Sequence, residues 1–212
     1  MSTHAATRSR RRGGAARRKA VLRRRLAALA VAAGVGLIAV WAMPEAKHAV
    51  REITLPLRHE DVIRQQAAAK GVDASLIAAV IYTESHFRDQ TSRVGAKGLM
   101  QLMPATADYI ARLSGGTAFQ QGDLATPQIN IAYGSYYLHY LLKKYRGSEV
   151  LALAAYNGGE GKVDEWLAGA AARGERFTVA RHIPFAETRD YVQKVMATQK
   201  DYRRQYPREL GL

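Results

Sequence analysis

The chain has 212 residues, enough for one or two domains, and most of it has the composition of an ordinary globular protein. Its formal net charge is +14, but ten of its 32 basic residues lie within the first 25 residues, which contain no acid. The other 22 basic residues face 18 acidic ones, so the rest of the chain carries only +4. The absence of cysteine excludes disulfides and a lipid anchor attached to cysteine.

An uncharged, apolar run at residues 26–43 follows the basic tail. Its eighteen residues are just enough to cross a bilayer as a helix, with Trp41 near the interface. Because arginines precede the run, residues 1–25 should stay in the cytoplasm while the chain after Pro44 is exported. We expect a single-pass transmembrane signal anchor in the inner membrane. The small residues near Pro44 leave a cleaved signal peptide as the alternative.

The basic tail has two possible partners. Clustered Arg and Lys side chains attract anionic membrane lipids, at about 1 kcal/mol for each residue near the surface. They can also neutralise nucleic-acid phosphates without sequence preference. The adjacent apolar run favours anionic inner-membrane lipids, and we expect no nucleic acid.

Residues 44–58 have mixed charge and two prolines, which is typical of a linker. Residues 59–207 then form a predicted domain of about 150 residues, enough to bury close to 70% of its unfolded surface. Its fold class should be all-α, because helical periodicity recurs and strand alternation is nearly absent. The predicted helices lie at residues 59–69, 74–86, 105–113, 127–145, 149–156, 160–168 and 187–205.

The ends of these predicted helices carry matching signals. Proline suits a first helical turn, serine or threonine an N-cap, and glycine a C-terminal cap. Such residues stand at Pro104, Pro127, Thr126, Ser148, Gly71, Gly115 and Gly147. Short connections between the helices indicate one compact domain.

Glu84 lies near the end of the apolar segment 73–85, on the helix face that also presents Ile77 and Ile81. A carboxyl held against apolar walls is harder to ionise, which is what a general acid near neutral pH requires. The alternative is a frayed helix end that turns Glu84 toward water. The sequence that follows favours the buried acid.

Four short motifs occur in order along the domain. They are Glu-Ser-His-Phe at 84–87, Gly-Ala-Lys-Gly-Leu-Met-Gln at 95–101, Ala-Tyr-Asn-Gly-Gly at 155–159 and Ile-Pro-Phe-Ala-Glu-Thr at 183–188. The paired glycines of the second motif allow a sharp turn and a close approach to a ligand. The third motif delivers a tyrosine and an asparagine from a helix end onto a glycine turn.

With these motifs the chain resembles lytic transglycosylases of the soluble-lytic-transglycosylase (SLT) type over about residues 60–205. The resemblance implies a lysozyme-like catalytic domain in which Glu84 is the catalytic acid and base, and Tyr156 positions it or the neighbouring sugar. Further residues of the implied site are Ser92, Gln101, Met103 and Asn157 in the groove that holds the amino sugars, with Glu187 supporting it. The chain departs from the family pattern in two places. Asp89 stands where the family often has proline, and Ser92 follows Glu84 by eight residues instead of nine.

The implied reaction cleaves the β-1,4 bond between N-acetylmuramic acid and N-acetylglucosamine without water, giving 1,6-anhydromuramoyl ends. Most glycosidases use two carboxyl groups about 5 to 9.5 Å apart, but this sequence offers one acid on an apolar face and no obvious second. Asp89 and Asp108 lie in polar settings, where we expect them to be solvated. Glu84 must then act first as acid and afterwards as base, with help from the 2-acetamido group of the substrate.

The tyrosines and histidines of the domain have simpler structural roles. Tyr133, Tyr137 and Tyr140 share one helix face, and packing is favoured over lining a sugar groove. The histidines lack metal-ligand spacing, and we interpret His86 as a residue at the groove rim. We expect no metal and no cofactor.

The sequence therefore predicts a membrane-anchored lytic transglycosylase with its domain in the periplasm or cell-wall space and peptidoglycan glycan strands as partner. A secretion or division assembly is a further possible partner. Two alternatives remain: a hydrolase of the same bond that resembles goose-type lysozyme, and a non-catalytic scaffold that binds the cell wall. A buried acid argues against the scaffold, because a pure binder has no use for it.

Overall fold

The chain divides into two units, Met1–Thr54 and Leu55–Leu212. The computed structural model describes residues 24–26, 29–34, 49–116 and 118–212. In the first unit, the described residues are helical. Most of the predicted membrane span at 26–43 lies outside the described residues. Among the residues that are described, no helix is long and apolar enough to cross a membrane.

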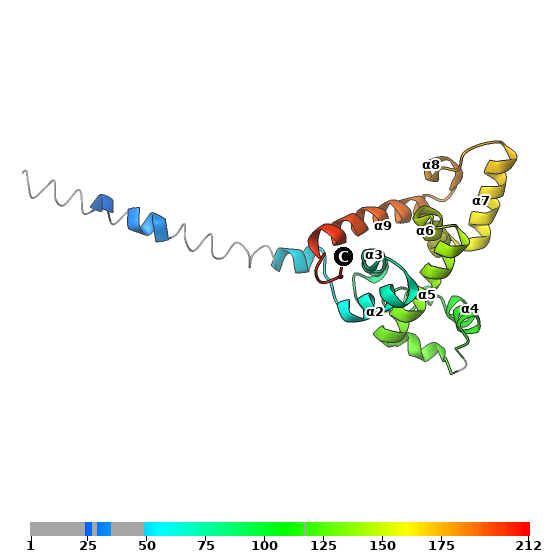
Figure 1. Cartoon of the computed structure of the whole chain (residues 1–212), viewed down its shortest axis with the longest axis horizontal. Coiled ribbons are helices and arrows are strands. Elements are labelled where there is room, and N and C mark those ends of the chain that lie inside the picture. Colours follow the sequence, from blue (N-terminus) through cyan, green and yellow to red (C-terminus); the bar gives the residue numbers. More distant parts are fainter. Residues whose placement is uncertain (1–23, 27–28, 35–48, 117) are drawn as a thin grey trace, which may run out of the picture. The chain divides into compact units, whose positions relative to one another are not determined.

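The second unit is helical, which confirms the predicted all-α class (Figure 1). Its described residues contain no strand, only isolated bridges of Lys97 with Thr91 and Leu102. All seven predicted helices are present. The elements are α2 (Glu60–Lys70), α3 (Ala74–Ser85), α4 (Pro104–Ser114), η1 (Gln121–Ala125), α5 (Pro127–Lys144), α6 (Glu149–Gly158), α7 (Glu160–Ala172), α8 (Val179–His182) and α9 (Ala186–Gln205).

Helix α3 forms the centre of the core. Every residue from Ala74 to Ile81 is buried, as expected of a helix that is apolar on all sides. Helix α9 packs against both α3 and α6, and α5 packs against α2 and α6. Leu55 and Leu210 are also buried in this core, so the packed unit includes residues just outside the predicted range 59–207.

The predicted capping residues mostly have the expected places. Pro104 and Pro127 occupy the first turns of α4 and α5, and the hydroxyl of Ser148 accepts a hydrogen bond from the Leu151 N–H at the start of α6. Thr126 stands at the N-cap of α5, but its side chain makes no capping hydrogen bond. Gly71 and Gly115 end α2 and α4 with positive φ. The C-cap of α5 is Tyr145, and Gly147 follows it in the turn.

The abrupt end of α3 positions its last acid. His86 and Phe87 both have positive φ, at 52° and 59°, a conformation that cannot continue a right-handed helix. The hydroxyl of Ser85 bonds to the carbonyls of Ile81 and Leu99, at 3.1 and 2.7 Å. Glu84 therefore lies in the final turn of α3. The next residue, Ser85, ties this helix end to the chain at Leu99.

Candidate active site

Glu84 is half-buried at the end of α3. Burial raises the pKa of its carboxyl from 4.5 to about 7, although Tyr191 and the positive charge of Lys194 both act to lower it. Near neutral pH a large fraction of this carboxyl therefore still carries its proton. The frayed, solvated alternative is wrong, because Glu84 lies within the last turn of α3 and its side chain is half-buried.

Tyr191 lies beside Glu84 and was not assigned a role from the sequence. It is buried on α9 and interacts with the Glu84 carboxyl, which lowers the Glu84 pKa. The contact falls outside hydrogen-bond geometry, and the buried Tyr191 hydroxyl has no partner in the described part of the chain. A small movement of either side chain would give Glu84 a hydrogen-bond donor.

Tyr156 approaches the same carboxyl from α6. Its hydroxyl donates a hydrogen bond to the Met100 carbonyl at 2.8 Å. Burial raises the pKa of Tyr156 well above 10, and the nearby charge of Glu84 raises it further. The hydroxyl therefore stays protonated and remains a donor beside Glu84.

Asn130 of α5 binds the loop from Gly98 to Gln101. No pattern in the sequence singled out this residue. The fully buried Asn130 side chain accepts a hydrogen bond from the Met100 N–H at 2.8 Å. It also donates to the carbonyls of Lys97 and Leu124, both at 3.0 Å. The bonds to Lys97 and Met100 fix the path of the loop whose Met100 carbonyl receives Tyr156, and the bond to Leu124 ties Asn130 to η1.

Gln101 and Ser92 stabilise the loops in which they lie. Gln101 has a left-handed φ of 47°, and its amide nitrogen donates to the carbonyls of Gln90 and Gly98, at 3.0 and 2.7 Å. The Ser92 hydroxyl accepts a hydrogen bond from the Ala96 N–H at 3.0 Å. Their contacts in the structure are thus with the backbone of residues 90–98, and their predicted contacts with sugars remain predictions.

The other predicted groove residues lie at helix ends. Met103 is the N-cap of α4 and is 41% exposed, and Asn157 is half-buried in the last turn of α6. Glu187 is exposed in the first turn of α9, beside the buried Thr188. Their roles toward a substrate stay predictions.

The remaining candidate residues lie at the surface or pack against other side chains. Asp89 is exposed and lines an open polar pocket of about 440 Å³ with Thr91 and Lys97, and Glu84 is not part of that lining. The half-buried Asp108 accepts a hydrogen bond from Gln121 at 3.0 Å. His86 is exposed at the C-cap of α3, with its ring 4.5 Å from that of Tyr82. The tyrosines of α5 pack against the core.

Fold and site together define a lysozyme-like helical domain built around the half-buried acid Glu84. The family model "Transglycosylase SLT domain" matches residues 61–178, and the chain belongs to this family.

Individual relatives agree with this membership. The soluble lytic murein transglycosylase of Escherichia coli strain K12 is 34% identical, over 72% of this chain and 24% of that protein. Membrane-bound lytic murein transglycosylase C of Edwardsiella ictaluri is 33% identical, over 69% of this chain and 47% of that protein. Among solved structures, an inactive glutamate-to-glutamine mutant of lytic transglycosylase Slt from Pseudomonas aeruginosa has a TM-score of 0.66 and 36% identity, over 73% of this chain and 25% of that one. The chain thus spans a quarter to a half of the length of these relatives.

Proposed function

We propose that the protein is a peptidoglycan lytic transglycosylase with Glu84 as its catalytic acid and base. The observation that carries this proposal is the burial of Glu84, which raises the pKa of its carboxyl to about 7 within a domain of the SLT family. The Pseudomonas aeruginosa relative is inactive when one glutamate becomes glutamine, and we infer that Glu84 corresponds to that glutamate.

The first step is protonation of the glycosidic oxygen between N-acetylmuramic acid and N-acetylglucosamine. The Glu84 carboxyl gives its proton to this oxygen as the bond from C1 of the muramoyl residue breaks. The N-acetylglucosamine residue leaves with a hydroxyl, and the 2-acetamido oxygen stabilises the positive charge at C1. Glu84 is now a carboxylate, whose charge is stabilised by the nearby Tyr191 and Lys194.

The second step closes the anhydro ring and restores the acid. The C6 hydroxyl of the same muramoyl residue attacks C1 and gives its proton to the Glu84 carboxylate. No water is consumed, and the high effective concentration of an intramolecular hydroxyl favours this route over hydrolysis. In this proposal Tyr156 orients Glu84 or the sugar beside it. The groove around them would comprise Ser92, Gln101, Met103 and Asn157, with Glu187 as its support.

We also propose the membrane arrangement expected from the sequence. Residues 1–25 are a cytoplasmic tail on anionic lipids, 26–43 a signal anchor, 44–58 a linker, and 59–207 the domain that acts on the cell wall. The existence of a relative named as membrane-bound supports an attachment to the membrane. A carbonate wash of cell membranes tests the anchor: the full chain should stay in the membrane pellet, and its release would contradict the span.

Digestion of purified sacculi tests the activity. The full chain in detergent should release muropeptides one water lighter than hydrolysis products, and Glu84→Gln should release none. Glu165→Gln is the matched control, because it makes the same chemical change at an exposed acid of α7. Hydrated products would instead support a lysozyme-like hydrolase, and no release by the wild type would support a binding scaffold.

A further inference from the structure

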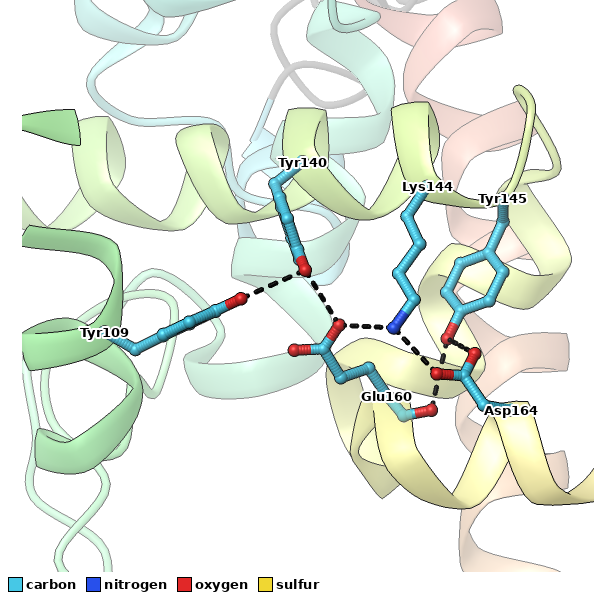
Figure 2. Close-up of polar contacts among 6 residues, drawn as sticks. All are labelled: Tyr109, Tyr140, Lys144, Tyr145, Glu160 and Asp164. Atoms are coloured by element: carbon cyan, nitrogen blue, oxygen red, sulfur yellow. Dashed lines mark hydrogen bonds and ion pairs between the residues drawn. The ribbon is translucent and has the colours of Figure 1, made fainter. Parts of the chain in front are cut away.

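A chain of polar contacts outside the four motifs joins three helices (Figure 2). The Tyr109 hydroxyl of α4 donates to the Tyr140 hydroxyl of α5 at 3.0 Å, and Tyr140 donates to Oε2 of Glu160 on α7 at 3.1 Å. The Lys144 ammonium binds the same oxygen at 2.7 Å. A hydroxyl can accept one hydrogen bond while it donates another, so Tyr140 links α4 to α7. Removing its hydroxyl would break both bonds of this link.

The two outer helices of the link each follow a segment that carries predicted site residues. Helix α4 begins at Pro104, directly after the motif loop, residues 98–103. Helix α7 begins at Glu160, directly after the glycine turn, residues 157–159. The position of each helix therefore determines where the segment before it lies.

Side chains of α5 hold the start of α7. Gly159 is the one residue between α6 and α7, its φ is 92°, and a methyl group added to it would meet nothing within 4 Å. A glycine in open space restrains the chain little, because it adopts more backbone conformations than any other residue. The contacts of Glu160 supply the restraint: Tyr140 and Lys144 bind its carboxylate, and the Tyr145 hydroxyl bonds to its carbonyl at 3.2 Å.

Beside Glu84 the motif loop is joined to the end of α6 by a second contact. There the Tyr156 hydroxyl donates to the Met100 carbonyl at 2.8 Å. The site thus has an inner bond next to the acid and an outer link through Tyr140. Without the outer link, the inner bond alone would have to keep the two segments together, and water would reach Glu84 more easily.

We propose that Tyr140 is a positioning residue, whose link between α4 and α7 keeps the motif loop and the glycine turn in place beside Glu84. It acts through Tyr109 and Glu160 and takes no part in the chemistry. This inference rests on the proposed function, since Glu84 is the acid whose surroundings the link would maintain.

Tyr140→Phe tests the proposal, because it removes the hydroxyl and keeps the ring that stacks 6.2 Å from that of Tyr137. In the full chain in detergent, this variant should release muropeptides from sacculi about tenfold more slowly, since small displacements of positioning groups cost rate. The rate is measured at a temperature where thermal unfolding shows the variant to be folded. Tyr136→Phe is the matched control on the same helix. Its hydroxyl bonds to the Leu113 carbonyl instead, and the variant should act like the wild type.

A titration of Glu84 separates positioning from stability. Carbon NMR of the glutamate carboxyl groups gives its pKa, and the signal that disappears in Glu84→Gln identifies it. Burial raises this pKa to about 7, so segments that move apart and admit water should lower it in Tyr140→Phe. The ionisable groups that face Glu84, which are Tyr191 and Lys194 on α9 and Tyr156 on α6, stay unchanged in these variants. A purely structural role of Tyr140 would leave the pKa in the folded protein where it is.

Two further variants show whether the link acts as a unit. Tyr109→Phe removes only the bond to α4. Combined with Tyr140→Phe it should cause no additional loss, because the Tyr140 change has already broken both bonds. Glu160→Gln removes the charge of the acceptor with little change in shape. It should act in the same direction, so it carries the test if Tyr140→Phe does not fold.

An unchanged release rate or an unchanged Glu84 pKa in Tyr140→Phe would overturn the proposal, as would losses that add in the double variant. Failure of the proposed function looks different. In that case the wild type would release no anhydro products, while the NMR titration would still show whether Tyr140 acts on Glu84.

Discussion

The hydroxyl of Tyr156 donates a hydrogen bond to the backbone carbonyl of Met100 at 2.8 Å, which ties the end of α6 to the loop after Gly98. The same loop accepts the Ser85 hydroxyl at the carbonyl of Leu99, at 2.7 Å. Glu84 is thus bordered by two helix ends that share one loop. A change in the path of this loop should therefore alter the position of the Glu84 side chain.

The activity of the protein should fall as pH rises above about 7. Glu84 has to be protonated to serve as an acid, and burial raises the pKa of its carboxyl to about 7. Each further pH unit should lower kcat/KM about tenfold, because the protonated fraction falls by that factor. A pH profile of muropeptide release measures this limb. A limb near pH 4.5 would contradict the role assigned to burial.

Replacing Tyr191 by phenylalanine should move this alkaline limb to higher pH. The tyrosine interacts with the Glu84 carboxylate and lowers the Glu84 pKa, so its removal should raise that pKa. The ring that fills the core is retained. Tyr136→Phe is the control, because its hydroxyl bonds to the Leu113 carbonyl instead. An unmoved limb, or one shifted to lower pH, would show that Tyr191 does not act on Glu84.

Glu84→Gln should make the protein more stable at pH 8 but not at pH 4. The folded-state pKa of Glu84 is raised above the unfolded value of 4.5, so the folded state binds more protons between pH 4.5 and about 7. The wild type therefore loses stability as pH rises through this window, by up to about 3 kcal/mol. Thermal unfolding should show Tm values that agree at pH 4. At pH 8 they should differ by several degrees in favour of the variant. Equal Tm values at pH 8 would mean that burying the Glu84 charge costs little.

The sequence predicted the parts of this molecule that depend on local pattern. The long helices follow from apolar periodicity and their caps, while η1 and α8 are too short to show a period. Glu84 could be singled out because its apolar neighbours lie in one helix. Asn130 and Tyr191 could not, since each meets its partner through packing of distant segments and neither stands out in its own helix. The hydrogen bonds of the Gln101 side chain to backbone carbonyls could not be predicted either, because they depend on the left-handed backbone conformation at that residue.

Gly98→Ala should unfold or inactivate the protein, whereas Gly95→Ala should be tolerated. Both glycines have positive φ, 75° and 88°, so alanine brings backbone strain of about 1 to 2 kcal/mol at either position. Only at Gly98 would the new methyl group meet other atoms, 2.1 Å from the Asn130 amide nitrogen and 2.6 Å from the Leu124 carbonyl oxygen.

Asn130 cannot move aside without losing its three hydrogen bonds to the loop and to Leu124. The cost at Gly98 should therefore exceed that at Gly95 by at least about 2 kcal/mol, with a matching loss of muropeptide release. Urea unfolding of the two variants measures the difference. If both lose the same stability, the loop has room to shift away from Asn130, and the loop path does not depend on that side chain.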